Sequence, residues 1–345
     1  MDILNPSQSQ TTITLDFCKK LPKIELHAHL NGSIRLQTLK ELSLKKGFPF
    51  AFEEHSTRDL KACFSIFAQI HKVLIELDAI RRVTREMLQD FQLQNVVYLE
   101  IRTTPKNLEG VFTYEEYLEA ILDEIMNFNE QNKMIIRILF SVDRSRSIEQ
   151  AKKTVELLKK YKSHPLYSSY ILGFDYSGNP YQNSFRDFKE IFENARNNGF
   201  KTMIHIAETE GEDCKKESSE ILEFGPDRLG HFNYFDEKLL EMALKKKIPL
   251  EICPSSNVCT LGLKSLKEHH FGVFLKEKYP MSICTDDTGV FDTDLSKELY
   301  EMFRNFEMNV KEVKEFLLRS LECVLEEEVR KKVEPYFLKF FQEFE

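Results

Sequence analysis

Eight short apolar segments, most of them separated by amphipathic helical patterns, constrain the fold of this 345-residue chain more than any other feature. Each segment has the length and composition of a buried β-strand, and most run into polar or ionisable residues. Apolar residues at helical spacing occur in the regions between them, for example over residues 117–125 and 148–158. The eight segments are residues 23–30, 96–103, 135–143, 171–178, 201–208, 228–232, 248–257 and 281–288.

Strands that alternate with helices predict a parallel (β/α)8 TIM barrel, whose strands all end on one face. A doubly wound open sheet is the alternative, but it would keep the first and eighth strands apart. Residues 34–94 are rich in helix formers and should form a helical cap over or beside the barrel mouth, and residues 295–344 predict further helices. We expect one domain over residues 13–345 and a disordered N-terminus over residues 1–12.

Composition excludes several classes of protein. The net charge of −8 comes from intermixed acids and bases, which gives no basic footprint for nucleic acid. The sequence shows no secretory signal pattern, and no apolar run has membrane-spanning length. Seven cysteines without disulfide spacing fit a reducing compartment, and Cys253 and Cys284 should be inert core residues. We therefore expect a monomeric cytosolic protein that binds neither nucleic acid nor membranes.

Two histidines one residue apart, His27 and His29, close the first apolar segment. Side chains alternate between the two faces of a strand, so both imidazoles should point the same way. Two neutral imidazoles side by side are half of a divalent-metal site, although a pair of lining histidines without a metal is the alternative. Four later segments also end in ionisable residues, which a closed barrel would bring to the same place.

Five short motifs resemble the adenosine deaminase family in their order and spacing, and most closely its adenosine deaminase-like branch, the N6-methyl-AMP deaminases. The resemblance extends from about Leu21 to Lys332. The motifs are His27-Ala28-His29-Leu30-Asn31-Gly32-Ser33, His205-Ile206-Ala207-Glu208, Gly230-His231, Pro254-Ser255-Ser256-Asn257 and Cys284-Thr285-Asp286-Asp287.

The resemblance implies a metal site that also suits the chemistry of these residues. His27, His29 and His205 supply three nitrogens and Asp286 one carboxylate oxygen, a set that favours one Zn2+ per chain and leaves a place for water. Zinc lowers the pKa of such a water towards about 7. Asp286 could also receive the water proton, and His231 could orient the water, unless His231 is only a core histidine.

The other implied contacts are to the purine ring. Glu208 would carry the proton to N1 during hydrolytic deamination at C6, unless it is only an exposed loop carboxylate. Asp287 is expected to hydrogen-bond to N7 and the backbone of Gly178 to contact N3, where glycine permits a close approach. His29 is also expected to contact the substrate.

Asn31 stands where adenosine deaminases proper have an aspartate that holds the ribose 5′-hydroxyl. A neutral amide tolerates a 5′-phosphate and can donate to it, although Asn31 could also act as a helix cap. The hydroxyls and ammonium of Thr103-Thr104-Pro105-Lys106 make a plausible phosphate clamp, in which Lys106 replaces an arginine of some relatives and loses its bidentate fork. The resemblance also implies that His71 and Asp143 contact the nucleotide. The alternative for His71 is a packing role in the cap helix, and the alternative for Lys106 is a solvated cation on a loop.

These expectations favour a zinc hydrolase that converts a purine nucleoside monophosphate, most simply N6-methyl-AMP, to IMP and methylamine. Deamination of adenosine is the nearest alternative. A barrel amidohydrolase acting on another ring or an ester is a third, against which the placement of Glu208 and His231 argues. A catalytically silent barrel that acts as a binding protein is the alternative from a different class, and it predicts a missing ligand or acid.

Overall fold

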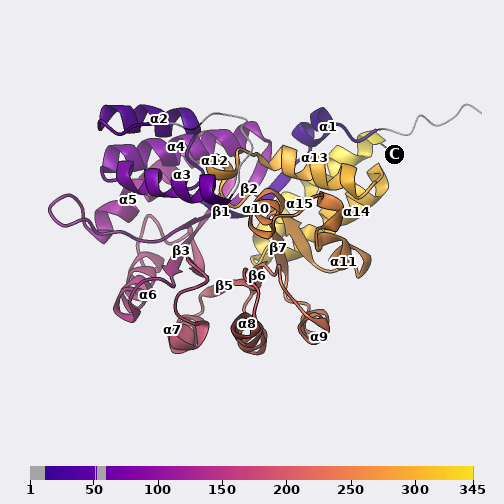
Figure 1. Ribbon diagram of the computed structural model, residues 1–345. Coiled ribbons are helices and arrows are strands. Elements are labelled where there is room, and N and C mark those ends of the chain that lie inside the picture. The colour runs from indigo at the N-terminus through magenta and orange to yellow at the C-terminus, as the bar shows by residue number, and fades with distance from the viewer. Residues whose placement is uncertain (1–11, 51, 53–59, 345) are drawn as a thin grey trace, which may run out of the picture.

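The computed structural model describes residues 12–50, 52 and 60–344, so the disorder predicted for residues 1–12 falls almost wholly outside the described part. Eight parallel strands follow one another around a single sheet in chain order, which confirms the predicted TIM barrel (Figure 1). The strands are β1 (Lys23–His29), β2 (Val96–Thr103), β3 (Ile135–Asp143), β4 (Ile171–Ser177), β5 (Lys201–Ile206), β6 (Arg228–His231), β7 (Leu250–Ile252) and β8 (Met281–Ile283).

The barrel closes between β1 and the residues that follow β8. The Asp286 amide donates to the His27 carbonyl at 2.8 Å, and the His29 amide donates to the Asp286 carbonyl at 2.8 Å. Ala28 and Asp286 form a parallel bridge at this seam. The open-sheet alternative is thereby excluded. The seam also consists of residues that the sequence placed in the metal site.

The helices pack around the outside of the strands, as the labels α6 to α9 beside β3 to β6 show (Figure 1). Several begin at side-chain caps, such as Thr113 for α5 and Ser147 for α6. The helices between β2 and β8 are α5 (Tyr114–Gln131), α6 (Ile148–Lys162), α7 (Phe185–Asn197), α8 (Glu212–Phe224), α9 (Glu237–Lys246), α10 (Pro254–Leu261) and α11 (Phe271–Lys276).

The insertion after β1 has two parts. Helix α4 (Leu77–Leu93) packs on α5 and β2, so it belongs to the outer layer of the barrel. Helices α2 (Leu36–Lys45) and α3 (Leu60–Val73) pack on each other, and α3 also contacts α12 (Thr288–Phe291), which follows β8. The cap expected over residues 34–94 is therefore confined to α2 and α3.

The chain ends in the helices expected after the last strand, α13 (Leu295–Asn305), α14 (Val310–Ser320) and α15 (Glu327–Phe341), and begins with the short helix α1 (Leu15–Lys20). Strands β7 and β8 are shorter than the apolar segments that predicted them. Pro254 starts α10 directly after β7, because proline suits the first turn of a helix and cannot donate to a sheet. Among the described helices, none is both long and apolar enough to cross a membrane.

Candidate active site

Four side chains from β1, β5 and the end of β8 meet at the seam where the barrel closes. The Nε2 atom of His29 lies 3.3 Å from Nε2 of His27 and 3.2 Å from Nε2 of His205. Oδ1 of Asp286 lies 3.5 Å from Nε2 of both His27 and His29. A tetrahedral ion with bonds of about 2.0–2.1 Å needs donors about 3.3 Å apart, so the spacing of these donor atoms fits zinc.

Buried carboxylates stand behind two of these histidines. Oε2 of Glu251 lies 2.7 Å from Nδ1 of His27, and Oδ1 of Asp175 lies 3.3 Å from Nδ1 of His205. The Glu251 carboxylate hydrogen-bonds to Nδ1 of His27, which holds the proton on that nitrogen and leaves the Nε2 lone pair for a metal. Asp175 stands next to Nδ1 of His205 but makes no hydrogen bond of good geometry with it. The residues therefore fit the ion not only by their donor atoms but also by the groups that orient the rings.

One arginine joins the two carboxylates. Arg102 on β2 donates from Nη1 to Asp175 at 2.9 Å and pairs through Nη2 with Glu251. All three side chains are completely buried. Burial acts to raise the pKa of both carboxyls, but Arg102 and the other positive or donating groups around them together outweigh it and hold each pKa below its usual value. Both carboxylates therefore stay ionised and can orient the histidines.

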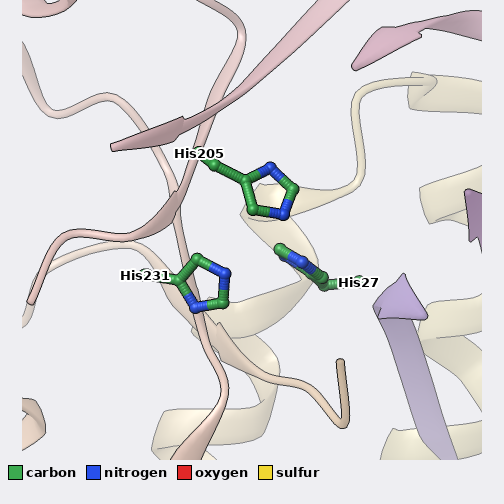
Figure 2. Close-up of side chains that lie close together, drawn as sticks. All are labelled: His27, His205 and His231. Carbon is green, nitrogen blue, oxygen red and sulfur yellow. The ribbon is translucent and has the colours of Figure 1, made fainter. Parts of the chain in front are cut away.

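His231, at the end of β6, approaches the same cluster, and Figure 2 shows its ring facing those of His27 and His205. The donor atoms of these three histidines lie within 4.8 Å of one another, as do those of His27, Cys253 and Asp286. Position alone therefore allows other donor sets. Burial raises the pKa of the Cys253 thiol far above its usual value, so this group is not a thiolate and is a poor ligand.

Glu208 follows β5 and lies on the open side of the cluster, with Oε1 3.9 Å from Nε2 of His231. Burial, helped by the charge of Asp286, raises the pKa of the Glu208 carboxyl above its usual value. Ala207 adopts a left-handed backbone, φ +54°, that turns the chain between His205 and Glu208. A carboxyl in this setting can hold a proton and deliver it to a neighbouring base.

Two glycines make room for acidic side chains of the site. A Cβ on Gly32 would lie 1.6 Å from Oδ1 of Asp287, so the loop after β1 can pass this carboxyl only as glycine. A Cβ on Gly178 would lie 2.3 Å from Oδ1 of Asp143, and its φ of +107° also favours glycine. Asp287 is buried, and burial together with the adjacent Asp286 raises its pKa well above the usual value.

A polar group lies beside the loop after β1, at the end of β2. The hydroxyls of Thr103 and Tyr117 are 2.6 Å apart, and the side chain of Asn31 interacts with the same Tyr117 hydroxyl. Lys106 extends over the Tyr117 ring, with Nζ 6.0 Å from its centroid. The structure therefore brings together Asn31, Thr103 and Lys106, which the sequence assigned to phosphate, and adds Tyr117.

A second cation, Arg146, lies at this end of the site and was missed from the sequence. Burial, then repulsion from Arg146, lowers the pKa of Lys106 to about 8. Burial, and then the charges of Lys106 and Arg146, also lower the pKa of His71. Because these charges act on His71, helix α3 lies beside Lys106 and Arg146. Thr104, Pro105, Asp143 and Arg146 line one small cavity, in which Arg146 pairs with Asp143 at 3.2 Å.

Charged residues inside the barrel were not predicted from the sequence. Their signal was a charged residue in the middle of a buried apolar strand, since such a group must be paired. Arg228 pairs with Glu100 and Glu251, and Glu25 accepts from the backbone and hydroxyl of Thr285 at 3.0 and 2.8 Å. The two arginines and three carboxylates that pair with one another form a buried ionic layer beneath the histidines: Arg102, Arg228, Glu100, Asp175 and Glu251.

Known proteins share the sequence and the fold of this chain along most of its length. The family model for adenosine deaminase matches residues 22–334. An N6-mAMP deaminase of Arabidopsis thaliana is 32% identical over 94% of this chain and 98% of its own length, and the human N6-methyl-AMP deaminase is 33% identical over 94% and 96%. The crystal structure of Arabidopsis ADAL complexed with IMP is 33% identical, covers 95% of this chain and 99% of that chain, and superposes with a TM-score of 0.86.

The matched region contains all eight strands and every residue of the histidine cluster. The identities exceed 30% along nearly the whole length of both partners, so the likeness is not confined to the barrel architecture. The resemblance drawn from the five motifs is thus confirmed, and this chain belongs to the adenosine deaminase family.

Proposed function

We propose that this protein is a zinc-dependent hydrolytic deaminase that removes the 6-amino or 6-alkylamino group of a purine nucleoside monophosphate. The substrate that fits best is N6-methyl-AMP, which with one water gives IMP and methylamine. The observation that carries the proposal is the convergence of four metal-donor atoms at 3.2–3.5 Å beside Glu208, a carboxyl whose pKa burial raises above its usual value. The relatives named N6-methyl-AMP deaminase and the IMP-bound structure support the substrate.

Zinc held by His27, His29, His205 and Asp286 would supply a Lewis acid that lowers the pKa of a water molecule. Glu208 donates its proton to N1 as the oxygen adds to C6, which keeps charge from building up on the ring. Asp286 accepts the water proton through Oδ2, the carboxyl oxygen 3.9 Å from His231. The C6–N6 bond then breaks, and methylamine leaves with the proton that Asp286 held. C6 keeps the oxygen, the remaining hydroxyl proton returns to Glu208, and N1 keeps the proton that it received.

The residues at the phosphate end of the candidate site, around Lys106, favour a nucleotide over a nucleoside as the substrate. Asn31 presents a neutral amide, while Lys106 and Arg146 place two cations at the same place. Two neighbouring cations repel each other, and a phosphate between them would relieve that repulsion. An aspartate in place of Asn31 would repel the same phosphate, because both groups are negatively charged.

Parallel assays on N6-methyl-AMP, AMP and adenosine test the substrate. Turnover is monitored by the change in purine absorbance. We expect the purified protein to have its highest kcat/KM on N6-methyl-AMP. A preference for adenosine would replace the proposal with adenosine deamination, and no turnover of any purine would favour a silent barrel.

Elemental analysis tests the metal. We expect one zinc per chain, and His205→Ala should lose both the zinc and the turnover because it removes one of four donors. His164→Ala is the matched control, since His164 lies between α6 and β4, away from the cluster. Full turnover in metal-stripped protein would contradict the zinc proposal.

A further inference from the structure

The hydrogen-bond partners of His231 define which of its two ring nitrogens carries the proton. Nε2 faces the site, 3.9 Å from Oε1 of Glu208 and 3.9 Å from Oδ2 of Asp286. Nδ1 faces away and lies 3.3 Å from the side-chain amide of Asn257. A neutral imidazole has one donor and one acceptor nitrogen, and the positions of the ring atoms do not distinguish them. The hydrogen-bond partners behind the ring distinguish the two nitrogens.

The assignment starts at a group that can only donate. The backbone N–H of Phe271, at the start of α11, donates to Nδ1 of His269 at 3.0 Å. Nδ1 of His269 must therefore offer its lone pair. His269 is 3% exposed, and burial lowers its pKa to about 2, so its ring is neutral and its single proton sits on Nε2.

The proton on His269 sets the orientation of Asn257. Nε2 of His269 lies 3.2 Å from Oδ1 of Asn257, and a protonated nitrogen must face the oxygen end of the amide. The reversed amide would place an NH2 group against an N–H in a fully buried position, which leaves both donors unsatisfied. The NH2 end of Asn257 therefore faces Nδ1 of His231.

Because the NH2 end of an amide can only donate, Nδ1 of His231 accepts. We infer that Asn257 and His269 are positioning residues that fix His231 as the tautomer with its proton on Nε2. A backbone amide in α11 thus sets the polarity of a ring three hydrogen bonds away. The next residue after His269, His270, also positions His231, but through the His231 backbone.

His270 holds the backbone of His231. Its Nε2–H donates to the His231 carbonyl at 2.9 Å, and its ring stacks on that of His269 with centroids 4.3 Å apart. His231 and the next residue, Phe232, have positive φ angles of 68° and 51°. Such a conformation is uncommon outside glycine and persists only where its surroundings enforce it. The His269–His270 pair before α11 therefore fixes both the backbone and the ring of His231.

The assigned tautomer gives His231 one role and excludes two others. A nitrogen that carries a proton can neither ligate a metal nor accept a proton, so the donor set that includes His231 is ruled out. His231 instead donates to the oxygen that attacks C6, and the acceptor for the water proton is Asp286. This role rests on the proposed function, whereas the tautomer does not.

The direct test is 15N NMR of histidine-labelled, zinc-loaded full-length protein. The protonated and unprotonated ring nitrogens of a neutral histidine have distinct shifts and couplings. His231→Gln identifies the His231 signals among those of the nine histidines. His164, whose Nδ1 also accepts from a backbone amide two residues on, is an internal reference for the Nε2–H form. We expect His231 to show Nε2–H, and a proton on Nδ1 would overturn the inference.

Asn257→Asp inverts the relay with almost no change of shape. A carboxylate still accepts from His269 but must also accept from His231, so the proton of His231 should move to Nδ1. We expect the zinc content to stay at one per chain and kcat on N6-methyl-AMP to fall about 10²–10³-fold, as when an aligned donor is lost from a transition state. A folded variant that keeps Nε2–H on His231 would contradict the relay.

His269→Phe and His269→Gln separate positioning from packing. Phenylalanine fills the space but cannot donate to Asn257, so kcat should fall with little change in KM. Glutamine restores an N–H donor, and we expect His269→Gln to recover part of the loss. Equal loss in both variants would make His269 a packing residue. If wild-type protein shows the Nε2–H tautomer but turns over no purine, the proposed function fails and the tautomer assignment stands.

Discussion

The two ends of the candidate site, the metal cluster and the group around Lys106, are built differently. At the metal end, His27, His205 and Asp286 are buried at the ends of strands, with completely buried charges behind the histidines. At the phosphate end, Asn31 and Lys106 lie on loops and His71 lies on α3, and all three keep part of their surface exposed. A strand end is held by hydrogen bonds to neighbouring strands, whereas a loop has few such ties. We expect changes at the metal end to abolish chemistry and changes at the phosphate end to shift substrate preference.

Glu208→Gln tests the metal end most severely. The amide keeps the shape but has no proton to give to N1, so kcat should fall about 10²–10⁴-fold while the zinc content stays at one per chain. Steady-state kinetics and elemental analysis measure both. Glu210→Gln is the control, because Glu210 is exposed two residues further along. Near-native turnover of Glu208→Gln would remove Glu208 from its role.

Arg102→Met tests whether the ionic layer beneath the histidines holds them in place. Removing one partner of a buried ion pair costs about 3–5 kcal/mol of unfolding free energy, and losing the groups that orient ligands weakens metal binding about 10–100-fold. Urea unfolding and competition with a chelator give the two values. Arg82→Met removes two ion pairs of a partly exposed arginine, with Glu41 and Glu86, and should cost less than the loss of Arg102, about 1 kcal/mol for each pair. Equal effects would mean that the buried layer has no special role.

Asn31→Asp tests the phosphate end. An anion against the substrate phosphate costs about 1–4 kcal/mol at intermediate dielectric, which is roughly 5-fold to nearly 1,000-fold in kcat/KM. The variant should lose activity on N6-methyl-AMP and keep or gain activity on the nucleoside. Kinetics on both substrates give the ratio. An unchanged ratio would show that Asn31 does not contact the phosphate.

The pH dependence of kcat/KM tests Lys106, with the smallest expected effect. Its pKa is lowered to about 8, so Lys106 is charged below pH 8 and loses its charge as the pH rises further. Loss of one charged contact, about 1.5 kcal/mol, should reduce kcat/KM on the nucleotide roughly tenfold above that pH and leave the nucleoside unaffected. Lys106→Ala should raise KM for the nucleotide below pH 8, and its KM should approach that of wild type above that pH.

Lys106→Arg is the matched variant for this profile, because a guanidinium stays charged throughout the range. The decline above pH 8 should disappear in this variant. If wild type and Lys106→Arg decline alike, another group titrates and Lys106 is not the phosphate contact.

Much of the metal end could be predicted because a barrel converts sequence order into position. Once eight alternating strands were recognised, the polar residues at their ends had to meet, which brought His27, His205 and Asp286 together before any coordinates were considered. The seam between β1 and β8 lies at these residues, so closure of the barrel and assembly of the site are one event.

Partners between side chains could not be predicted in the same way. Glu100, Arg102 and Arg228 were visible as charges inside apolar strands, but many pairings across the barrel satisfied the need for neutrality. Arg146 and Tyr117 looked like ordinary helix-start and core residues. Only the coordinates show Arg146 beside Lys106 and the Tyr117 hydroxyl beside Thr103.

The difference has a physical origin. Hydrophobic periodicity and strand alternation are local properties of the chain, so the residues alone defined the barrel, the face on which the chemistry lies and the family. Tautomers, ion-pair partners and pKa values depend on distances of a few ångströms between residues far apart in the sequence. The polarity of His231, set by Asn257, His269 and a backbone amide of α11, is therefore a property of the folded molecule alone.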